Sequence, residues 1–263
     1  MKTGLKFIGL FFAFAMLLSS CSMGSDDDVD DIWSGIGDGN TGNFVIGHAT
    51  VEGTANNFRL ILDNGTVLVI YYNNVVIPEN SDFGNGTRVI ANFTVLGTGE
   101  NNGVTYWSVR LNALTQILCK TPVFAWQSDI SQNDMGYDPI DVDKVWFGGK
   151  YLNVNFYLYT GSSSLEHFIN LWVDAEHPDA DEDNVYVEMR HNAYNDQQSS
   201  RVFGQVSFDI SDLLPKEKSS ITVHFTYTDY SGRTYTKSGE YTKKTVESVG
   251  NEAYARPATA LIN

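Results

Sequence analysis

The sequence predicts an all-β protein, and three observations lead to that prediction. From Asn43 onward, β-branched and aromatic residues alternate with polar residues in short runs. Asn, Asp and Gly residues separate the runs as turns would, and no amphipathic helix of useful length interrupts them. The chain of 263 residues is 42% hydrophobic and 13% aromatic, which is too apolar for a disordered chain and long enough for two domains.

The N-terminal segment has the features of a bacterial lipoprotein signal peptide. Lys2 and Lys6 give it a short positive region, and residues 7–18 form an unbroken run of apolar or small residues. These twelve residues are too few for a transmembrane helix, which needs about 20. The Leu-Ser-Ser-Cys sequence ending at Cys21 resembles a lipobox, in which the cysteine is lipidated and becomes the first mature residue. We expect residues 1–20 to be removed and acyl chains such as palmitate on Cys21 to hold the protein at the membrane.

Residues 21–42 are predicted to be a flexible acidic linker. Five of the six positions 26–31 are aspartates, whose mutual repulsion favours a solvated chain and whose flexibility disfavours a calcium site. The run resembles the export signal that sends Bacteroidetes lipoproteins to the outer face of the outer membrane. We therefore expect a lipid-anchored protein that faces the cell exterior, with the periplasmic face as the alternative. The residues of this signal are Asp26, Asp27, Asp28, Asp30 and Asp31.

Residues 43–122 are predicted to form a five-stranded barrel of the OB type. The sequence Asp63-Asn64-Gly65-Thr66 is typical of a tight hairpin, because both central positions need positive φ, which Asn and Gly adopt at little cost. Five consecutive antiparallel strands suit a closed barrel, since closure leaves no exposed edge. The expected strands are residues 44–52, 58–62, 67–72, 88–96 and 105–118.

A second domain, a seven-stranded β-sandwich, is predicted at residues 144–245. Residues 123–143 are polar with little periodicity and are expected to link the two domains, and residues 246–263 are expected to form a C-terminal tail. The strand spacing is that of a two-layer sandwich. The expected strands are residues 144–147, 152–159, 165–175, 185–193, 201–210, 221–229 and 235–242.

The acidic composition excludes one class of partner. Seventeen basic residues stand against 32 acidic ones, giving a net charge of −15, so the chain would repel nucleic acid. Loss of residues 1–20, which hold two lysines and no acid, takes the charge to −17. With Cys21 used for lipid, Cys119 is the one other cysteine, and we expect a buried structural thiol rather than a nucleophile.

Candidate catalytic and metal motifs weaken once their geometry is specified. The alternating Asp179, Asp181 and Asp183 resemble a calcium loop, but Arg190 holds the twelfth position, where such a loop needs a bidentate Glu. We interpret this stretch as a solvated hairpin turn, with a weak surface calcium site as the alternative. His167 and His177 lack the spacing of paired metal ligands. The sequence predicts a non-enzymatic protein with no cofactor.

Aromatic residues on the polar face of the predicted sandwich strands are the strongest candidates for binding. Alternation points Leu152, Val154, Phe156 and Leu158 inward and their neighbours outward. Outward aromatics either bury under another part of the chain or offer a platform for sugar rings or a protein partner. The candidates are Tyr157, Tyr159, Trp172 and Tyr186 in the sandwich, and Tyr71, Tyr72, Tyr106 and Trp107 in the barrel.

Over nearly all of its mature length the chain resembles the NigD-like lipoproteins of Bacteroidetes, named after a protein of a bacteriocin locus. The resemblance implies an OB-like domain followed by a β-sandwich, and a bacteriocin-immunity or accessory role with an extracellular protein or peptide as partner. The outward aromatics keep an alternative open, a glycan-binding accessory lipoprotein of a polysaccharide-uptake system. The resemblance rests on the lipobox cysteine, the acidic run, and the segments FRLILDNGT (58–66), VWFGGKYLNVNF (145–156), DISDLLP (209–215) and VHFTYTDYSG (223–232).

Overall fold

The computed structural model describes residues 32–35, 44–78, 81–124, 132–161 and 165–242, which lie in one compact unit, Asp31–Asn263. Cys21 and the acidic run at 26–31 lie outside the described residues, so the predictions made for them stay predictions. None of the helices described is both long and apolar enough to cross a membrane. The all-β prediction is confirmed, since the described part of the chain is built from β-sheets with one four-residue helix, α1 (Gln132–Met135).

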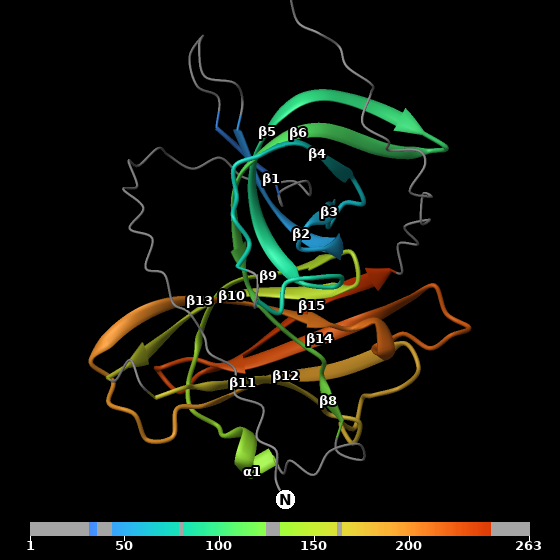
Figure 1. Cartoon of the computed structure of the whole chain (residues 1–263). Coiled ribbons are helices and arrows are strands. Elements are labelled where there is room, and N and C mark those ends of the chain that lie inside the picture. The colour runs from blue at the N-terminus through green and yellow to red at the C-terminus, as the bar shows by residue number, and fades with distance from the viewer. Residues whose placement is uncertain (1–31, 36–43, 79–80, 125–131, 162–164, 243–263) are drawn as a thin grey trace, which may run out of the picture. The chain divides into compact units, whose positions relative to one another are not determined.

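The first half of the described chain is a sheet that closes on itself into a barrel (Figure 1). Strand β2 pairs with β3 at its C-terminal half and with β5 at its N-terminal half, and β4 pairs in parallel with β6. The β2–β5 pairing closes the ring, and β1 adds a short strand on β2. The strands are β1 (Ile32–Gly35), β2 (Phe44–Thr54), β3 (Asn57–Leu62), β4 (Val67–Asn73), β5 (Arg88–Asn101) and β6 (Val104–Gln116).

The hairpin between β3 and β4 forms at the predicted residues but with a different turn. Leu62 and Thr66 pair through a backbone hydrogen bond of 2.9 Å, which leaves a three-residue loop. Gly65 has φ 89°, whereas Asn64 is not among the described residues with positive φ. The expected positive φ at both positions is therefore wrong for Asn64, because the extra loop residue lets Gly65 alone take the left-handed conformation. The turn leaves Asp63 buried at the end of the barrel.

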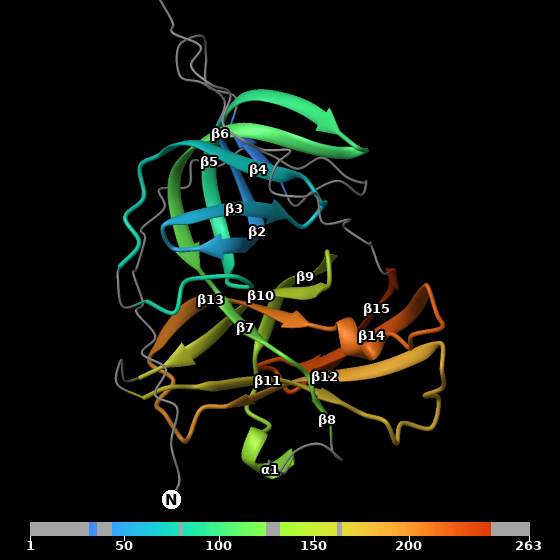
Figure 2. The same cartoon turned by 45° about the vertical axis from the view of Figure 1, so that its right-hand side comes forward.

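The second half is a sandwich of two sheets, seen as two layers in Figure 2. One sheet has the order β7-β13-β10-β9 and the other β15-β14-β12-β11-β8. The 3₁₀ turn η1 (Ser211–Leu213) follows β13. The strands are β7 (Leu118–Lys120), β8 (Val123–Phe124), β9 (Asp141–Gly148), β10 (Tyr151–Thr160), β11 (Phe168–Val173), β12 (Asn184–Asn192), β13 (Ser200–Asp209), β14 (Ser220–Thr228) and β15 (Thr234–Thr242).

Two short sandwich strands come from ranges that the sequence assigned elsewhere. Strand β7 lies within the predicted barrel range 43–122 and pairs with β13, and β8 lies within the predicted linker 123–143 and pairs with β11. The other sandwich strands, β9 to β15, correspond to the seven predicted runs. Cys119 lies on β7 and is exposed, so the expectation of a buried thiol is wrong. Its strand is three residues long and lies at the edge of its sheet, paired with β13 on one side.

The sandwich core follows the predicted alternation. Leu152, Val154, Phe156 and Leu158 of β10 face the core, as do Ile169, Leu171 and Val173 of β11. Gly204 of β13 lies opposite Phe156, and a Cβ atom there would come within 2.5 Å of the Phe156 ring. The barrel has its own core, in which Phe93, Leu60, Leu68 and Leu111 are fully buried.

A buried polar network links the barrel strands to the sandwich sheet. Arg88 at the start of β5 is 0% exposed, and its guanidinium contacts both carboxylate oxygens of Asp63, at 2.6 and 2.9 Å. The same guanidinium donates to Asn153 Oδ1 (3.0 Å) on β10 and Ser207 Oγ (3.3 Å) on β13. It also lies 4.1 Å from the centroid of the Tyr151 ring. The half of this sheet's outer face that contacts the barrel strands is therefore occupied. The other half, beyond Asn155, carries the candidate site.

Candidate functional site

The outer face of the β10–β13 ladder carries an exposed cluster of aromatic and charged side chains. Tyr157 and Phe203 are directly opposite in the ladder, with ring centroids 5.4 Å apart in an edge-to-face arrangement. Phe203 is a large apolar side chain and is 46% exposed; at its position β13 is paired with β10 alone, since β7 reaches only Val206–Phe208. The Arg201 guanidinium lies 3.6 Å from the centroid of the Tyr157 ring and 3.7 Å from Asp141. We call Tyr157, Arg201 and Phe203 the ladder patch.

Polar groups continue the ladder patch toward the buried network. The Gln205 amide donates to Asn155 Oδ1 at 2.9 Å, one cross-strand pair beyond Tyr157 and Phe203. Tyr159 lies at the opposite end of the patch and packs edge to face against Tyr230, with centroids 4.8 Å apart. The Tyr230 hydroxyl accepts the Tyr159 backbone N–H at 2.9 Å. The patch thus has an apolar centre, a cation at one side and amide groups at the other.

The other predicted sandwich aromatics do not join the ladder patch. Trp172 is 5% exposed and lies on the outer face of the other sheet, where β11 has neighbours on both sides. Tyr186 on β12 is stacked between two imidazoles, His177 at 3.6 Å and His224 at 4.3 Å, with interplanar angles of 8° and 10°. Both faces of the Tyr186 ring are therefore occupied. The four predicted residues fall at three separate places.

The barrel candidates are also divided. Trp107 packs against the barrel core, and its ring lies 6.2 Å from that of Phe93. Tyr72 is exposed, packs edge to face against Tyr71, and has the Arg110 guanidinium 5.5 Å from its centroid. A Cβ atom at Gly99 would come within 2.4 Å of the Tyr106 hydroxyl, so Tyr106 lies across the β5–β6 hairpin.

The acidic hairpin between β11 and β12 has the contacts of a capped turn. Asp181 Oδ1 accepts the backbone N–H groups of Asp183 (2.8 Å) and Asn184 (2.7 Å), together with the Asn184 side-chain amide (2.9 Å). These hydrogen bonds, that of Asp183 first, lower the pKa of Asp181. Lys218 forms ion pairs with Asp183 and Glu182. Among the described residues no group of three or more His, Cys, Asp or Glu side chains could hold a metal ion, Asp179, Asp181 and Asp183 included.

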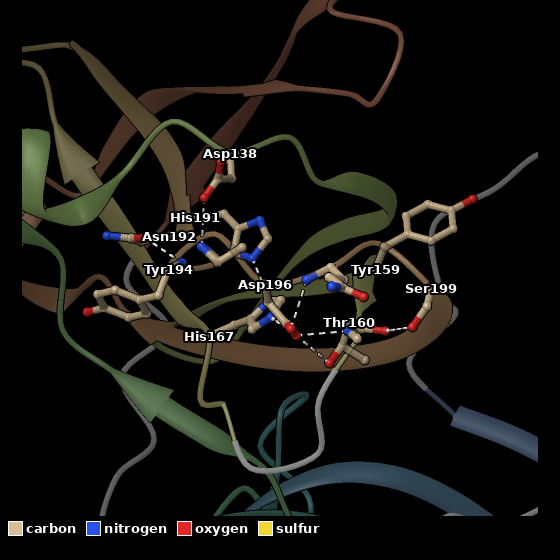
Figure 3. A network of polar contacts seen from close by, with 12 residues as sticks. Asp138, Tyr159, Thr160, His167, His191, Asn192, Tyr194, Asp196 and Ser199 are labelled. Carbon is tan, nitrogen blue, oxygen red and sulfur yellow. Dashed lines mark hydrogen bonds and ion pairs between the residues drawn. The ribbon is translucent and has the colours of Figure 1, made fainter.

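A chain of hydrogen-bonded side chains lies at one end of the sandwich (Figure 3). Asp196 Oδ2 is 3.2 Å from His167 Nε2, His167 Nδ1 is 2.9 Å from His191 Nε2, and His191 Nδ1 is 2.9 Å from the Pro139 carbonyl. The side chains of Asp196 and His167 are 5% and 7% exposed. Burial lowers the pKa of His191, and the hydrogen bond to the Pro139 carbonyl opposes that shift.

Asp196 also ties its own loop to the end of β10. Its Oδ2 accepts the Gly161 backbone N–H at 2.8 Å and the Thr160 hydroxyl at 3.0 Å, as the dashed lines of Figure 3 show. The Ser199 hydroxyl donates to the Thr160 carbonyl at 3.0 Å. Ser200 follows at once and begins β13, the strand that carries Arg201 and Phe203. We call Asp196, His167 and His191 the end network.

Sequence reasoning missed both Phe203 and the end network, for different reasons. Alternation along residues 201–210 already points Phe203 outward with Arg201, so the signal was present. His167 and His191 are 24 positions apart, and only the β11–β12 register, which pairs Ile169 with His191, makes them diagonal neighbours. His167 and His177, the pair weighed from the sequence as metal ligands, are not joined: His177 stacks on Tyr186 instead.

The fold and the ladder patch define a class: a two-part β protein with a closed barrel, a β-sandwich and an exposed aromatic face. Residues 122–241 match the NigD-like C-terminal beta sandwich domain. Solved structures resemble most of the chain. A protein from Parabacteroides distasonis, described as toxin related, is 31% identical, with 76% of this chain and 94% of that chain covered and a TM-score of 0.60.

Two further structures share the fold. A protein of unknown function from Bacteroides vulgatus is 25% identical, with 75% and 90% of the two chains covered and a TM-score of 0.60. A NigD-like immunity protein from Bacteroides caccae is 21% identical, with 76% and 97% covered and a TM-score of 0.58. No curated protein matches the chain. The chain belongs to the NigD-like family, and the resemblance found in its sequence is confirmed.

Proposed function

We propose that this protein is a non-enzymatic lipoprotein of the outer membrane, exposed on the cell surface, that binds an extracellular protein or peptide in a bacteriocin-immunity or accessory role. The observation that carries the proposal is the ladder patch, where Phe203 is 46% exposed beside Tyr157 and Arg201. Aromatic residues and arginine are the types enriched at the energetic centres of protein interfaces. The patch is held on two long paired strands, so little ordering is needed when a partner binds.

The position of the anchor supports the location. The lipobox cysteine, Cys21, would place the lipid at the first mature residue, and the acidic run at 26–31 would follow the lipid directly. Two or three acyl chains hold a protein essentially permanently, since each buried methylene contributes about 0.8 kcal/mol. A tethered protein meets its partner at the membrane, which suits interception of an incoming toxin. The toxin-related description of the 31% identical structure is in keeping with this role.

A protein or peptide fits the candidate rings better than a glycan does. A sugar ring stacks on a free aromatic face, yet the Tyr186 ring has an imidazole on each face and Tyr157 has Arg201 over one face. Trp172 is buried. The exposed ring of the ladder patch is that of Phe203, at 46%, and it has no hydroxyl or amine to bind sugar hydroxyls. The glycan-binding alternative is therefore the weaker proposal.

The arrangement of the end network also favours a non-enzymatic role. Asp196, His167 and His191 are arranged as base and orienting groups can be, but the chain of contacts ends on a backbone carbonyl, that of Pro139. The nearby Ser199 hydroxyl donates to the Thr160 carbonyl and not to a histidine. A nucleophile needs a base within hydrogen-bond reach, and in the described part of the chain the ring nitrogens of the two histidines contact Asp196, each other and the Pro139 carbonyl instead.

Survival of cells tests the proposed role. The full-length chain is expressed in a Bacteroidetes strain that is killed by the peptide fraction of spent medium from competing strains, and surviving cells are counted. We expect the wild-type chain to raise survival, and the Tyr157→Ala, Phe203→Ala double variant to abolish that protection at equal surface expression. Phe44→Ala, which removes an exposed aromatic ring from the barrel, is the matched control and is expected to protect fully.

A glycan screen provides the opposing outcome. The soluble chain beginning at Ser22 is applied to a glycan array and to immobilised polysaccharides. Saturable binding that is lost in Tyr157→Ala, together with no protection in the survival assay, would replace the proposed protein partner with a glycan.

A further inference from the structure

The hydrogen-bond contacts of the end network need more protons than two neutral histidines carry. Three contacts run in series: Asp196 to His167, His167 to His191, and His191 to the Pro139 carbonyl. A backbone carbonyl only accepts, so His191 Nδ1 must carry a hydrogen. The contact between the two rings needs one hydrogen, and so does the contact with Asp196. Three hydrogens are required, whereas two neutral imidazoles carry two.

We propose that Asp196, His167 and His191 share one additional proton, and that this proton fixes the loop 193–199 and with it the Arg201–Phe203 end of the ladder patch. The network is complete only when it holds three protons, which makes its net charge zero. With two protons, the Asp196 carboxylate faces an unprotonated ring nitrogen or the two rings lose their contact. With four, either two N–H groups meet or the carboxylate itself is protonated.

The surroundings of Asp196 place the additional proton on the rings. Asp196 Oδ2 accepts hydrogen bonds from Gly161 and Thr160, and Oδ1 accepts the Gln197 backbone N–H at 2.8 Å. Several donors on one carboxylate favour its ionised form. Because burial lowers the pKa of His191, the charge is expected on His167, beside the carboxylate. Asp138 is the other charged group that acts on His191, and it accepts the Ala193 backbone N–H at 2.7 Å.

The loop has a conformation that needs such support. Tyr194 and Asn195 have φ values of 51° and 62°, in the left-handed region, which is costly for tyrosine. Figure 3 shows Asp196 between His167 and the end of β10 at Thr160, directly before the turn into β13. When the additional proton leaves at higher pH, the contact of Asp196 with His167 is lost or becomes repulsive. We therefore expect the loop, and the start of β13 after it, to loosen as pH rises.

Nitrogen NMR of the histidine rings tests the shared proton without any partner. The ¹⁵N-labelled chain beginning at Ser22 is titrated between about pH 5 and 9, the range in which histidines change charge. We expect both nitrogens of His167 to be protonated near neutral pH, His191 to be the Nδ1–H tautomer, and both rings to change at one midpoint. Above that midpoint the protection of the Gly161 and Gln197 amides, which is their exchange rate corrected for the intrinsic rise with pH, should fall about tenfold.

Asp196→Asn removes the charge while keeping an acceptor of similar shape. It should move the midpoint of the network to lower pH, because no carboxylate charge then holds the additional proton. His177→Gln, which alters the Tyr186 stack and not the end network, should leave the midpoint unchanged. Wild-type spectra decide the matter even if Asp196→Asn does not fold: two rings that are both neutral at pH 7, or that titrate independently, overturn the shared proton.

The link to binding rests on the proposed function and has its own readout. The Arg201 and Phe203 amide signals should move with the same midpoint as His167. Signals that stay constant through the titration would overturn the link to the ladder patch. Because no partner enters these measurements, lack of protection in the survival assay would overturn the proposed function and leave the shared proton standing.

Discussion

Arg88 is the residue on which the contact between barrel and sandwich depends. Its guanidinium is fully buried and donates to Asp63 and Thr50 of the barrel and to Asn153 and Ser207 of the sandwich. Burying an ion pair costs desolvation that the pair only partly returns, so such a network is retained for what it positions. Each partner here is hydrogen-bonded, and a Cβ atom at Gly148 would lie 2.1 Å from Asp63 Oδ2, which shows how closely the two halves pack.

Removing Arg88 alone should be strongly destabilising. In Arg88→Ala the buried Asp63 carboxylate loses its bidentate partner, and we expect the free energy of unfolding to fall by about 3–5 kcal/mol in urea titrations. The Arg88→Met, Asp63→Leu double variant leaves no uncompensated charge and should lose less. Lys150→Ala breaks the half-exposed pair with Asp209 and should cost under about 1 kcal/mol. Equal losses in Arg88→Ala and Lys150→Ala would contradict the assigned role.

His48 gives the stability a pH dependence. Burial lowers its pKa from 6.5 to about 4, opposed by Asp63 and reinforced by Arg88 and Lys144, and its ring packs edge to face on Trp146. Between those two pH values the unfolded chain binds a proton that the folded chain does not. The free energy of unfolding should therefore fall by about 3 kcal/mol from this residue as pH drops from 6.5 to 4. In His48→Gln that part of the slope should vanish in urea titrations at each pH; an unchanged slope would assign it to other groups.

Strand β13 shows how one element serves both the core and the candidate site. Its inward residues Val206 and Phe208 are buried in the core, while Arg201 and Phe203 on the opposite side form the ladder patch. Gly204 lies between them, opposite Phe156, where a side chain would meet the ring. The small residue lets the large Phe156 ring fill the space of two core positions, and this keeps β10 and β13 in register beneath Tyr157 and Phe203.

Gly204→Ala should overpack the sandwich core. The new methyl group would meet the Phe156 ring at 2.5 Å, so ring or strand must shift, and we expect a loss of about 1–3 kcal/mol in the free energy of unfolding. Gly97→Ala is the matched control, because that strand glycine of β5 has no atom within 4 Å of an added Cβ and does not have positive φ. It should change stability by less than about 0.5 kcal/mol. A neutral Gly204→Ala would mean that the core has room at Phe156.

The sequence predicted elements well where one physical signal dominated. Period-two alternation along 152–159 identified the inward face of β10, because only apolar side chains can face the core. Strands β7 and β8 were missed because three and two residues are too short to show a period. Contacts that depend on register, such as His167 with His191 or Arg88 with Asn153, could not be found, since pairing between distant strands leaves no local signal. The burial of Trp172 depends likewise on neighbouring strands.

At the scale of the whole molecule, charge and anchorage act together. The mature chain would carry a net charge of −17 beside an anionic membrane, which keeps the body in solvent and steers cationic partners toward it over about a Debye length. If the body is tethered as proposed, it needs a linker that spans the distance from the membrane. An acidic run would suit that task, because mutual repulsion extends charged linkers.

The acidic run should decide on which side of the outer membrane the body lies. If it acts as an export signal, replacing Asp26, Asp27, Asp28, Asp30 and Asp31 with Asn should leave the protein in the outer membrane but protect it from protease added to intact cells, whereas the wild-type chain is digested. Glu176→Gln with Asp179→Asn removes exposed acids from the sandwich and should not alter digestion. Cys21→Ala should remove the protein from the outer membrane, because under the proposed function the acyl chains on Cys21 would be its anchor there. Digestion of the Asn variant at the wild-type rate would show that the run is a linker only, and the surface location would then need another signal within the described body.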